Sequence, residues 1–318
     1  MNFIKNQPRK QEKYHRLNLK EEKKILEFIS FLKSCSNNYY KITEIFHFAE
    51  KHGYHFTPTH FYSPIPTVHE LPEKVFETKE NVLFDWNETL QLELLQKFQN
   101  FSTEYEKLIS EKKFDDKNGA FEWHDAPMYY SMIRHFKPAK IVEVGVGYST
   151  IIGSLAVEKN GQSQISAIDP YLAQDLKKKL PRQVSLIEKP VQEIPISFFK
   201  ELQQNDILFI DDSHVSKIGS DVNFLFLDVL PELNPGVIVH IHDIFLPKQY
   251  PKEWILEDHR RFWNEQYLLE AFMIGNTKFE VLIANHFLGY KHPNKLQNFY
   301  KTNPPVSGGG SFWIRKKS

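Results

Sequence analysis

Residues 140–150, with the sequence KIVEVGVGYST, predict a β-strand that turns on two glycines into a helix. Apolar β-branched residues surround Glu143, and Gly145 and Gly147 then interrupt the strand. Glycines in such a turn let a ligand approach the backbone, and the N-terminus of the following helix offers unpaired N–H groups. This corner is typical of sites for dinucleotides, nucleoside triphosphates or S-adenosylmethionine (SAM).

From residue 125 onward, helical and strand-like patterns alternate along the chain. Strands are predicted at 140–144, 164–168, 183–187, 206–210, 237–242, 279–284 and 311–315. Helices are predicted at 125–136, 150–159, 171–179, 195–203, 216–230 and 253–274. This alternation predicts an α/β fold with a mostly parallel sheet covered on both faces, and ligands bind such sheets beyond the carboxyl ends of the strands.

The N-terminal part of the chain has a different texture. Residues 1–20 are rich in lysine and arginine and are predicted to form a disordered basic tail. Residues 21–120 are predicted to be mainly helical, with helices starting at Ile25 and spanning 41–52 and 88–110. The proline- and aromatic-rich segment 54–72 is predicted to be a loop, either wrapping the core surface or acting as a lid.

Composition excludes several classes of protein. The 318 residues carry 40 basic and 40 acidic side chains, and this balance argues against nucleic acid as a partner. The single cysteine, Cys35, excludes an internal disulfide framework and favours a reducing compartment. No apolar run approaches the roughly 20 residues that a membrane span needs, and the N-terminus lacks a signal-peptide pattern. The sequence therefore predicts a soluble cytoplasmic protein.

The residues around the glycine corner discriminate between cofactors. An NAD fingerprint needs a third glycine where this chain has Thr150, and no P-loop sequence follows the strand. Asp169 lies 24 residues after Gly145, at the end of the next predicted strand. A carboxylate at that position can accept hydrogen bonds from both hydroxyls of a ribose.

Over residues 118–318, the chain resembles the class I SAM-dependent methyltransferases, near the metal-dependent sugar and macrolide O-methyltransferases. The resemblance rests on EVGVGYST, AIDP, FIDDSHVSKIGSDVNFLFLDVLPELNPGVIVHIHDIF, RRFWNEQYLLEAF and GGSFWIRK. It implies a Rossmann-like seven-stranded sheet whose last strand is antiparallel, and a methyltransferase domain over residues 121–318. The two C-terminal strands predicted from the residue pattern agree with that topology.

The resemblance also implies which residues bind SAM. Glu143, Gly145, Gly147 and Ser149 would line the methionine end of the cofactor. Asp169 would hold the ribose, and Val191 and Gln192 would flank the adenine. The acidic residue usual after the third strand is missing from this chain, where the sequence reads Lys-Pro-Val-Gln over 189–192.

Polar residues gather after two predicted strands that should be neighbours, namely Asp211, Asp212, His214, His240, His242 and Asp243. Carboxylates and an imidazole are suitable ligands for Mg²⁺ or Mn²⁺, which would acidify a substrate hydroxyl. Metal-dependent relatives imply Asp211, His242 and Asp243 as ligands and His214 as the general base. The chain departs from them at His242, where an oxygen donor is usual. Asp211 bonding SAM without a metal stays open, and period-two alternation favours His240 as a core histidine.

We therefore expect a SAM-dependent methyltransferase that modifies a hydroxyl of a small molecule or a sugar-containing metabolite. The 54–72 loop and the 88–110 helix are expected to cover the acceptor pocket, with His60, Tyr62 and Arg261 as substrate contacts. A surface salt bridge is the alternative role for Arg261. A catalytically silent SAM-binding scaffold and a nucleic-acid methyltransferase recruited by the basic tail remain alternatives, and a homo-oligomer remains open.

Overall fold

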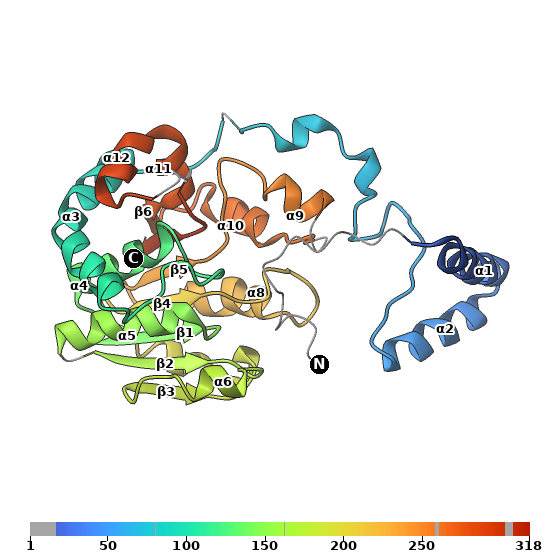
Figure 1. Ribbon diagram of the computed structural model, residues 1–318, viewed down its shortest axis with the longest axis horizontal. Coiled ribbons are helices and arrows are strands. Elements are labelled where there is room, and N and C mark those ends of the chain that lie inside the picture. The colour runs from blue at the N-terminus through green and yellow to red at the C-terminus, as the bar shows by residue number, and fades with distance from the viewer. Residues whose placement is uncertain (1–16, 80, 162, 258–260, 303–307) are drawn as a thin grey trace. The chain divides into compact units, whose positions relative to one another are not determined.

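The computed structural model describes residues 17–79, 81–161, 163–257, 261–302 and 308–318 (Figure 1). The chain divides into two compact units, Met1–Thr67 and Val68–Ser318. The predicted SAM-binding residues all fall in the second unit. The expected domain 121–318 stays a prediction, and the compact unit that contains it begins further upstream.

The first unit contains two helices, α1 (Leu19–Cys35) and α2 (Tyr39–Lys51). Asn18 caps α1 by accepting from the amides of Lys20 and Glu21, and Glu21 in turn accepts from the amide of Asn18. This reciprocal capping box explains why the helix begins earlier than the apolar pattern alone indicates. Most of the predicted tail, over residues 1–16, lies outside the described residues, and α1 already begins within its last two positions.

The second unit is built on one seven-stranded sheet with the order β3-β2-β1-β4-β5-β7-β6. Its strands are β1 (Lys140–Val144), β2 (Gln164–Ile168), β3 (Val184–Ile187), β4 (Ile207–Ile210), β5 (Ile238–Ile241), β6 (Phe279–Ala284) and β7 (Phe312–Lys316). The first five pair in parallel, whereas β7 runs antiparallel to both β5 and β6. The predicted Rossmann-like sheet with an antiparallel last strand is confirmed.

Helices of the second unit pack around this sheet. They are α3 (Glu88–Ser110), α4 (Asp125–Phe136), α5 (Tyr148–Asn160), α6 (Gln174–Lys177), α7 (Ile196–Phe199), α8 (Asp221–Phe224), α9 (Lys252–Leu256), α10 (Glu265–Met273), α11 (Asn285–Lys291) and α12 (Pro293–Phe299). α3 contacts α4, α12 and β6, and α4 contacts α5. The helix expected to cover the acceptor pocket, α3, thus buries its apolar face in the core of the unit.

Several predicted helices are shorter than the sequence pattern indicated. The predicted helix 216–230 consists of α8, a π-helical turn over Leu225–Val229 and a 3₁₀ turn over Leu230–Glu232. The predicted helix 253–274 is interrupted, and α9 and α10 are its two described parts. α11 and α12 were not predicted. Hydrogen bonds to the distant residue His214 fix the start of α10, and local periodicity does not reveal such bonds.

Buried aromatic rings join the sheet to α4. Tyr129 packs against Phe209 with ring centroids 4.5 Å apart, and Phe209 stacks on His240 at 3.9 Å. Trp313 of β7 lies 4.5 Å from His240. These rings form a continuous layer beneath the carboxyl ends of β4 and β5 and hold that edge rigid. Among the described helices, none combines the length and the apolarity that crossing a membrane requires.

Candidate functional site

The turn after β1 can accommodate only glycine at position 145. Gly145 has φ +84°, and an added Cβ would lie 2.1 Å from the backbone oxygen of Asp211. The amide of Gly145 donates to Ile168 O at 3.0 Å, and the amide of Asp211 donates to Val144 O at 2.9 Å. The hydrogen bonding of the sheet therefore continues past the last residues of β2, β1 and β4, and it holds the loops after these strands together at the carboxyl edge.

Glu143 is a fully buried carboxyl beneath this turn. Its Oε1 accepts from the hydroxyls of Ser149 at 2.6 Å and Thr150 at 2.9 Å, both in the first turn of α5. Its Oε2 has no hydrogen-bond partner among the described residues. Burial raises the pKa of Glu143 to about 8, even though the two hydroxyls oppose the shift. The carboxyl thus anchors the helix to the strand and keeps one oxygen free.

A cavity of about 390 Å³ opens at this carboxyl edge, where the loops after β1, β2, β3 and β4 meet. It is lined by Val144, Gly145, Ile168, Asp169, Pro170, Tyr171, Pro190, Val191, Gln192, Asp211, Asp212, Ser213, Lys217, Gly219, Ser220 and Asp221. The position agrees with the general rule that ligands of parallel sheets bind beyond the strand ends.

Most, but not all, of the predicted cofactor residues line this cavity. Those that do are Gly145, Asp169, Val191, Gln192 and Asp211. Those that do not are Glu143, Gly147 and Ser149. The last three lie at the junction of β1 and α5, where they shape the turn. The cofactor roles of all eight stay predictions.

Asp169 is held at the rim of the cavity by backbone donors. Its Oδ1 accepts from the amide of Tyr171 at 2.7 Å, and its Oδ2 lies 3.4 Å from the amide of Val146. The carboxylate therefore spans the loops after β1 and β2. An acceptor fixed in this way is suited to two neighbouring hydroxyls of a ligand.

The segment 217–221 lines the cavity although the sequence analysis assigned it no role. Gln192 donates to the backbone oxygen of Gly219 at 3.0 Å, which ties this segment to the loop after β3. Ser220 caps α8 by accepting from the amide of Asn223 at 3.1 Å. The Gly-Ser pair before a helix was the available signal, since it marks a turn and an N-cap.

His214 lies just beyond this cavity and is buried, with 6% of its surface exposed. It has φ +57°, a left-handed conformation that is uncommon for histidine. Its Nε2 lies 3.3 Å from Oδ1 of Asp211 and 3.6 Å from Oδ2 of Asp243. Its Nδ1 lies 2.9 Å from Oε2 of Glu265. The two ring nitrogens therefore face different carboxyls, and only the Nε2 side adjoins a cavity-lining residue.

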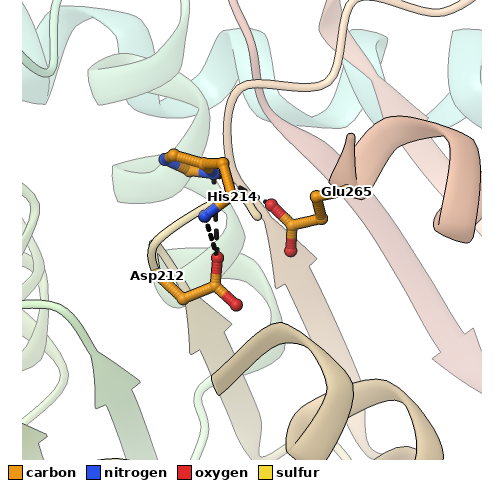
Figure 2. A group of neighbouring side chains, drawn as sticks. All are labelled: Asp212, His214 and Glu265. Carbon is orange, nitrogen blue, oxygen red and sulfur yellow. Dashed lines mark hydrogen bonds and ion pairs between the residues drawn. The ribbon is translucent and has the colours of Figure 1, made fainter. Parts of the chain in front are cut away.

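Figure 2 shows Asp212, His214 and Glu265 as one cluster. Oδ1 of Asp212 accepts from the amide of His214 at 2.8 Å and lies 3.8 Å from its Nδ1. Oδ2 of Asp212 and Oε1 of Glu265 are buried, and neither has a partner among the described residues. Of the groups that the described residues form, this one brings three possible metal-ligand atoms within 4.8 Å of one another. The sequence analysis did not find Glu265, because it is 51 residues from His214 in the chain.

The charges of this cluster are strongly coupled. Burial alone would lower the pKa of His214, but the contacts with Asp211 and Glu265 raise it well above its usual range. Burial raises the pKa of Asp212, and the nearby charge of Glu265 raises it further. Burial also raises the pKa of Glu265 despite the hydrogen bond with His214. A protonated His214 accompanied by a carboxylate is the arrangement that these shifts favour.

The end of β5 adds a second histidine–carboxylate pair. Nε2 of His242 lies 3.7 Å from Oδ1 of Asp243, and Nδ1 of His242 is buried with no partner among the described residues. Burial would raise the pKa of Asp211, but the charges of His242 and His214 hold it below its usual range. The pKa of Asp243 is raised because its burial outweighs the two histidines. The charges of these neighbouring residues therefore shift one another's pKa values, namely those of Asp211, His242 and Asp243.

These three residues offer a donor set that suits a divalent cation of the Mn²⁺ type, with two carboxylates and an imidazole. The unpartnered Nδ1 of His242 agrees with such a role. Their ligand atoms do not form a group within 4.8 Å among the described residues, where only the Asp212 cluster does so. Metal binding by Asp211, His242 and Asp243 therefore stays a prediction.

His240 lies deeper in β5, where period-two alternation placed it. Its Nε2 lies 3.0 Å from the hydroxyl of Ser311, and its ring stacks on Phe209. Burial holds its pKa well below the usual range. It is a neutral core histidine, as expected.

Two of the predicted substrate contacts belong to the first unit and one belongs to the second. His60 and Tyr62 are exposed residues of the first unit. In the second unit, the guanidinium of Arg261 lies over the rings of Trp254 and Trp263, 4.3 Å and 5.0 Å from their centroids. Trp263 in turn lies 4.3 Å from the ring of His214. Arg261 is therefore linked to the site by aromatic stacking, and the substrate roles stay predictions.

The sheet order, the glycine turn and the cavity at the carboxyl edge together define an α/β protein of the Rossmann-like class that binds a nucleotide-type cofactor. The continuation of the sheet by an antiparallel β7 between β5 and β6 distinguishes it from the dinucleotide-binding arrangement.

Comparisons with known proteins agree with this class. A family model described as a methyltransferase domain matches residues 142–244. An uncharacterised protein of Archaeoglobus fulgidus is 34% identical over 167 residues, which cover 48% of this chain and 76% of that protein. Residues 142–244 therefore belong to a methyltransferase domain, and the sheet around them has the Rossmann-like topology described above.

Solved structures show more distant likeness. The SAH-bound methyltransferase PaMTH1 of Podospora anserina is 18% identical, with a TM-score of 0.39, over 71% of this chain and 88% of that one. The O-methyltransferase TomG of Streptomyces achromogenes is 12% identical, with a TM-score of 0.41, over 71% of this chain and 90% of that one. Likeness of this degree says nothing about the acceptor of the present chain.

Proposed function

We propose that this methyltransferase transfers the methyl group of SAM to a hydroxyl of a small molecule or a sugar-containing metabolite, with His214 as the general base. One observation carries the proposal. Asp211 lines the cofactor cavity and also lies 3.3 Å from Nε2 of His214, so a single side chain connects the two halves of the site.

When bound, SAM supplies a methyl group on a positively charged sulfur. Asp169 receives the ribose hydroxyls, while Gly145 lets the cofactor approach the backbone. His214 accepts the proton of the acceptor hydroxyl at Nε2 as the oxygen–carbon bond forms and the sulfur–carbon bond breaks. A neighbouring positive charge lowers a histidine pKa, so the sulfonium favours the neutral imidazole that this role requires.

A metal-assisted version of this chemistry uses the same loops. Asp211, His242 and Asp243 would hold Mg²⁺ or Mn²⁺, and the ion would acidify the acceptor hydroxyl. The two carboxylates and the unpartnered Nδ1 of His242 support this version. Arg261, stacked over Trp254 and Trp263, is a proposed contact of the acceptor. The single cysteine supports a cytoplasmic location.

The test is formation of S-adenosylhomocysteine from SAM with a panel of hydroxyl and amine acceptors, measured with and without Mn²⁺. The proposal expects turnover with hydroxyl acceptors that falls about 100-fold or more in His214→Asn, while the affinity for SAM is retained. Turnover confined to amines would contradict O-methylation. SAM binding without turnover on any acceptor would favour the catalytically silent scaffold.

A further inference from the structure

Glu265 is a buried carboxyl that the proposed reaction leaves without a role. It is the first residue of α10 and is 1% exposed. One of its oxygens, Oε2, lies 2.9 Å from Nδ1 of His214, whereas Oε1 has no partner among the described residues (Figure 2). Burying a carboxyl in this way is costly unless a hydrogen bond or an opposite charge compensates for it. His214 supplies that compensation.

Hydrogen bonds between the start of α10 and the loop after β4 fix the position of Glu265 beside His214. The amides of Asn264 and Glu265 both donate to the backbone oxygen of His214, at 3.1 Å and 3.2 Å. The side chain of Asn264 accepts from the amide of Ser216 at 2.6 Å and donates to its carbonyl at 3.3 Å. The start of α10 is therefore fastened to the loop after β4 by four hydrogen bonds. The approach of Glu265 to His214 follows from this attachment rather than from one side-chain rotamer.

The two nitrogens of His214 are consequently not equivalent. Nδ1 faces Glu265, with Asp212 next nearest at 3.8 Å. Nε2 faces Asp211 and Asp243 at the ends of β4 and β5. A neutral imidazole carries a single proton, and the contact of Nδ1 with Glu265 at 2.9 Å is shorter than that of Nε2 with Asp211 at 3.3 Å, which favours the proton on Nδ1. The lone pair then lies on Nε2, which adjoins the cavity residue Asp211.

We propose that Glu265 is a positioning residue for His214: it selects the tautomer with the proton on Nδ1 and so leaves Nε2 free to act as the base. This inference rests on the proposed function. When the acceptor proton moves to Nε2, Glu265 keeps its negative charge and offsets the charge of the imidazolium, without taking the proton itself. Trp263, 4.3 Å from the ring of His214, limits the access of water to the pair.

The first test reads the protonation of His214 directly, in the full chain without any acceptor, over a pH range that extends to the neutral imidazole. Imidazole ¹⁵N spectra are recorded for the wild type and Glu265→Gln, with His214→Asn used to assign the signal. The proposal expects a proton on Nδ1 in the wild type whose resonance shifts or disappears in Glu265→Gln. An unprotonated Nδ1 in the wild type, or identical Nδ1 signals in the two proteins, would overturn it.

Glu270→Gln is the matched control, because Glu270 belongs to the same helix but pairs with Lys79 away from His214. This variant is expected to leave the His214 signals unchanged. Glu265→Asp keeps the charge on a shorter side chain and is expected to retain part of the wild-type Nδ1 signal. If Glu270→Gln changed the His214 signals as Glu265→Gln does, disruption of α10 alone would explain the change. That outcome would contradict the proposal.

The second test is kinetic and uses whichever acceptor the turnover assay identifies. Glu265→Gln is expected to lower kcat about 10- to 100-fold with the KM for SAM unchanged, and Glu265→Asp to recover part of the loss. An unchanged kcat would overturn the proposal. Because the spectra need no acceptor, they test Glu265 even if O-methylation fails. Conversely, turnover by the wild type supports O-methylation even if the spectra contradict the role of Glu265.

A divalent cation held by Asp212, His214 and Glu265 is the competing explanation of the cluster. Calorimetric titration with Mn²⁺ alone separates the two. Binding that is lost in Glu265→Gln but retained in Asp243→Asn would place the ion on Nδ1 of His214 and overturn the positioning role. Binding retained in Glu265→Gln, or no binding by the wild type, agrees with the proposal.

Discussion

At the scale of single residues, the site is governed by carboxyls whose surroundings differ. Glu143 is compensated by hydroxyls, Asp169 by backbone amides, and Glu265 by an imidazole. Burial raises the pKa of Glu143 and of Glu265, and the hydrogen-bond partners of each oppose that rise. In the proposed mechanism, residues of one chemical type therefore serve as anchor, cofactor acceptor and positioning group within one edge of the sheet.

Replacing Asp169 should weaken the binding of SAM. Two hydrogen bonds from a ribose to a charged acceptor contribute about 1.5–3 kcal/mol each, so Asp169→Ala is expected to raise the Kd at least about 100-fold. Calorimetric titration with SAM measures the change, and Asp175→Ala, an exposed aspartate of α6, is the control. Equal affinities in the wild type and Asp169→Ala would contradict the assignment of Asp169 to the ribose.

The buried Glu143 should make stability depend on pH. Its folded pKa of about 8 lies above the ordinary 4.5, so the folded state holds the proton more tightly than the unfolded chain. Its contribution is therefore complete below pH 4.5 and is lost as the pH rises through 8. Glu143→Gln can still accept from Ser149 and Thr150 but does not titrate. Relative to the wild type, its free energy of unfolding should rise by about 4 kcal/mol between pH 5 and pH 9.

Urea denaturation at several pH values measures this difference for the protein without cofactor. Parallel curves for the wild type and Glu143→Gln would show that Glu143 has an ordinary pKa, and would remove the argument for a buried neutral carboxyl beneath the glycine turn.

At the scale of elements, the site depends on how loops after successive strands meet. The turn after β1 approaches the loop after β4 through Gly145 and Asp211, and the start of α10 is fastened to that same loop. The local patterns for β1, β2, β6, α3 and α4 predicted their bounds as the structure has them. The predicted helix 253–274 failed because Asn264 and Glu265 bond to His214, a partner that periodicity cannot reveal.

Gly145→Ala should be far more damaging than the same change at Gly161. Both glycines have left-handed φ values, +84° and +88°, which cost an alanine about 1–2 kcal/mol. At Gly161 an added Cβ meets nothing within 4 Å, whereas at Gly145 it would lie 2.1 Å from the oxygen of Asp211. Denaturation should show an additional loss of about 1–3 kcal/mol for Gly145→Ala. Equal losses for the two variants would exclude the close approach.

At the scale of the whole molecule, two compact units differ in how much core they contain. The unit Val68–Ser318 has an extensive buried core around its sheet, while Cys35 and Ala49 are the residues buried in the two helices of the unit Met1–Thr67. All residues that line the cofactor cavity lie in the second unit. Cofactor binding is therefore a property of that unit.

The chain shortened to residues 68–318 should consequently fold cooperatively and bind SAM with the affinity of the full chain. Its turnover should fall if His60 and Tyr62 contact the acceptor as the sequence analysis predicts. Calorimetry measures the first property and formation of S-adenosylhomocysteine the second. Loss of SAM affinity on shortening would contradict the independence of the second unit, and unchanged turnover would exclude His60 and Tyr62 as acceptor contacts.

By itself, the sequence determined the fold class, the glycine turn and most of the residues at the carboxyl edge, because these follow from local patterns and from the rule that places ligands beyond parallel strands. Only the tertiary structure decided which side chains share that edge. The pairing of His214 with Glu265, the contact between Gly145 and Asp211, and the cavity role of segment 217–221 all join distant parts of the chain. Such contacts depend on how loops pack, and no local periodicity encodes them.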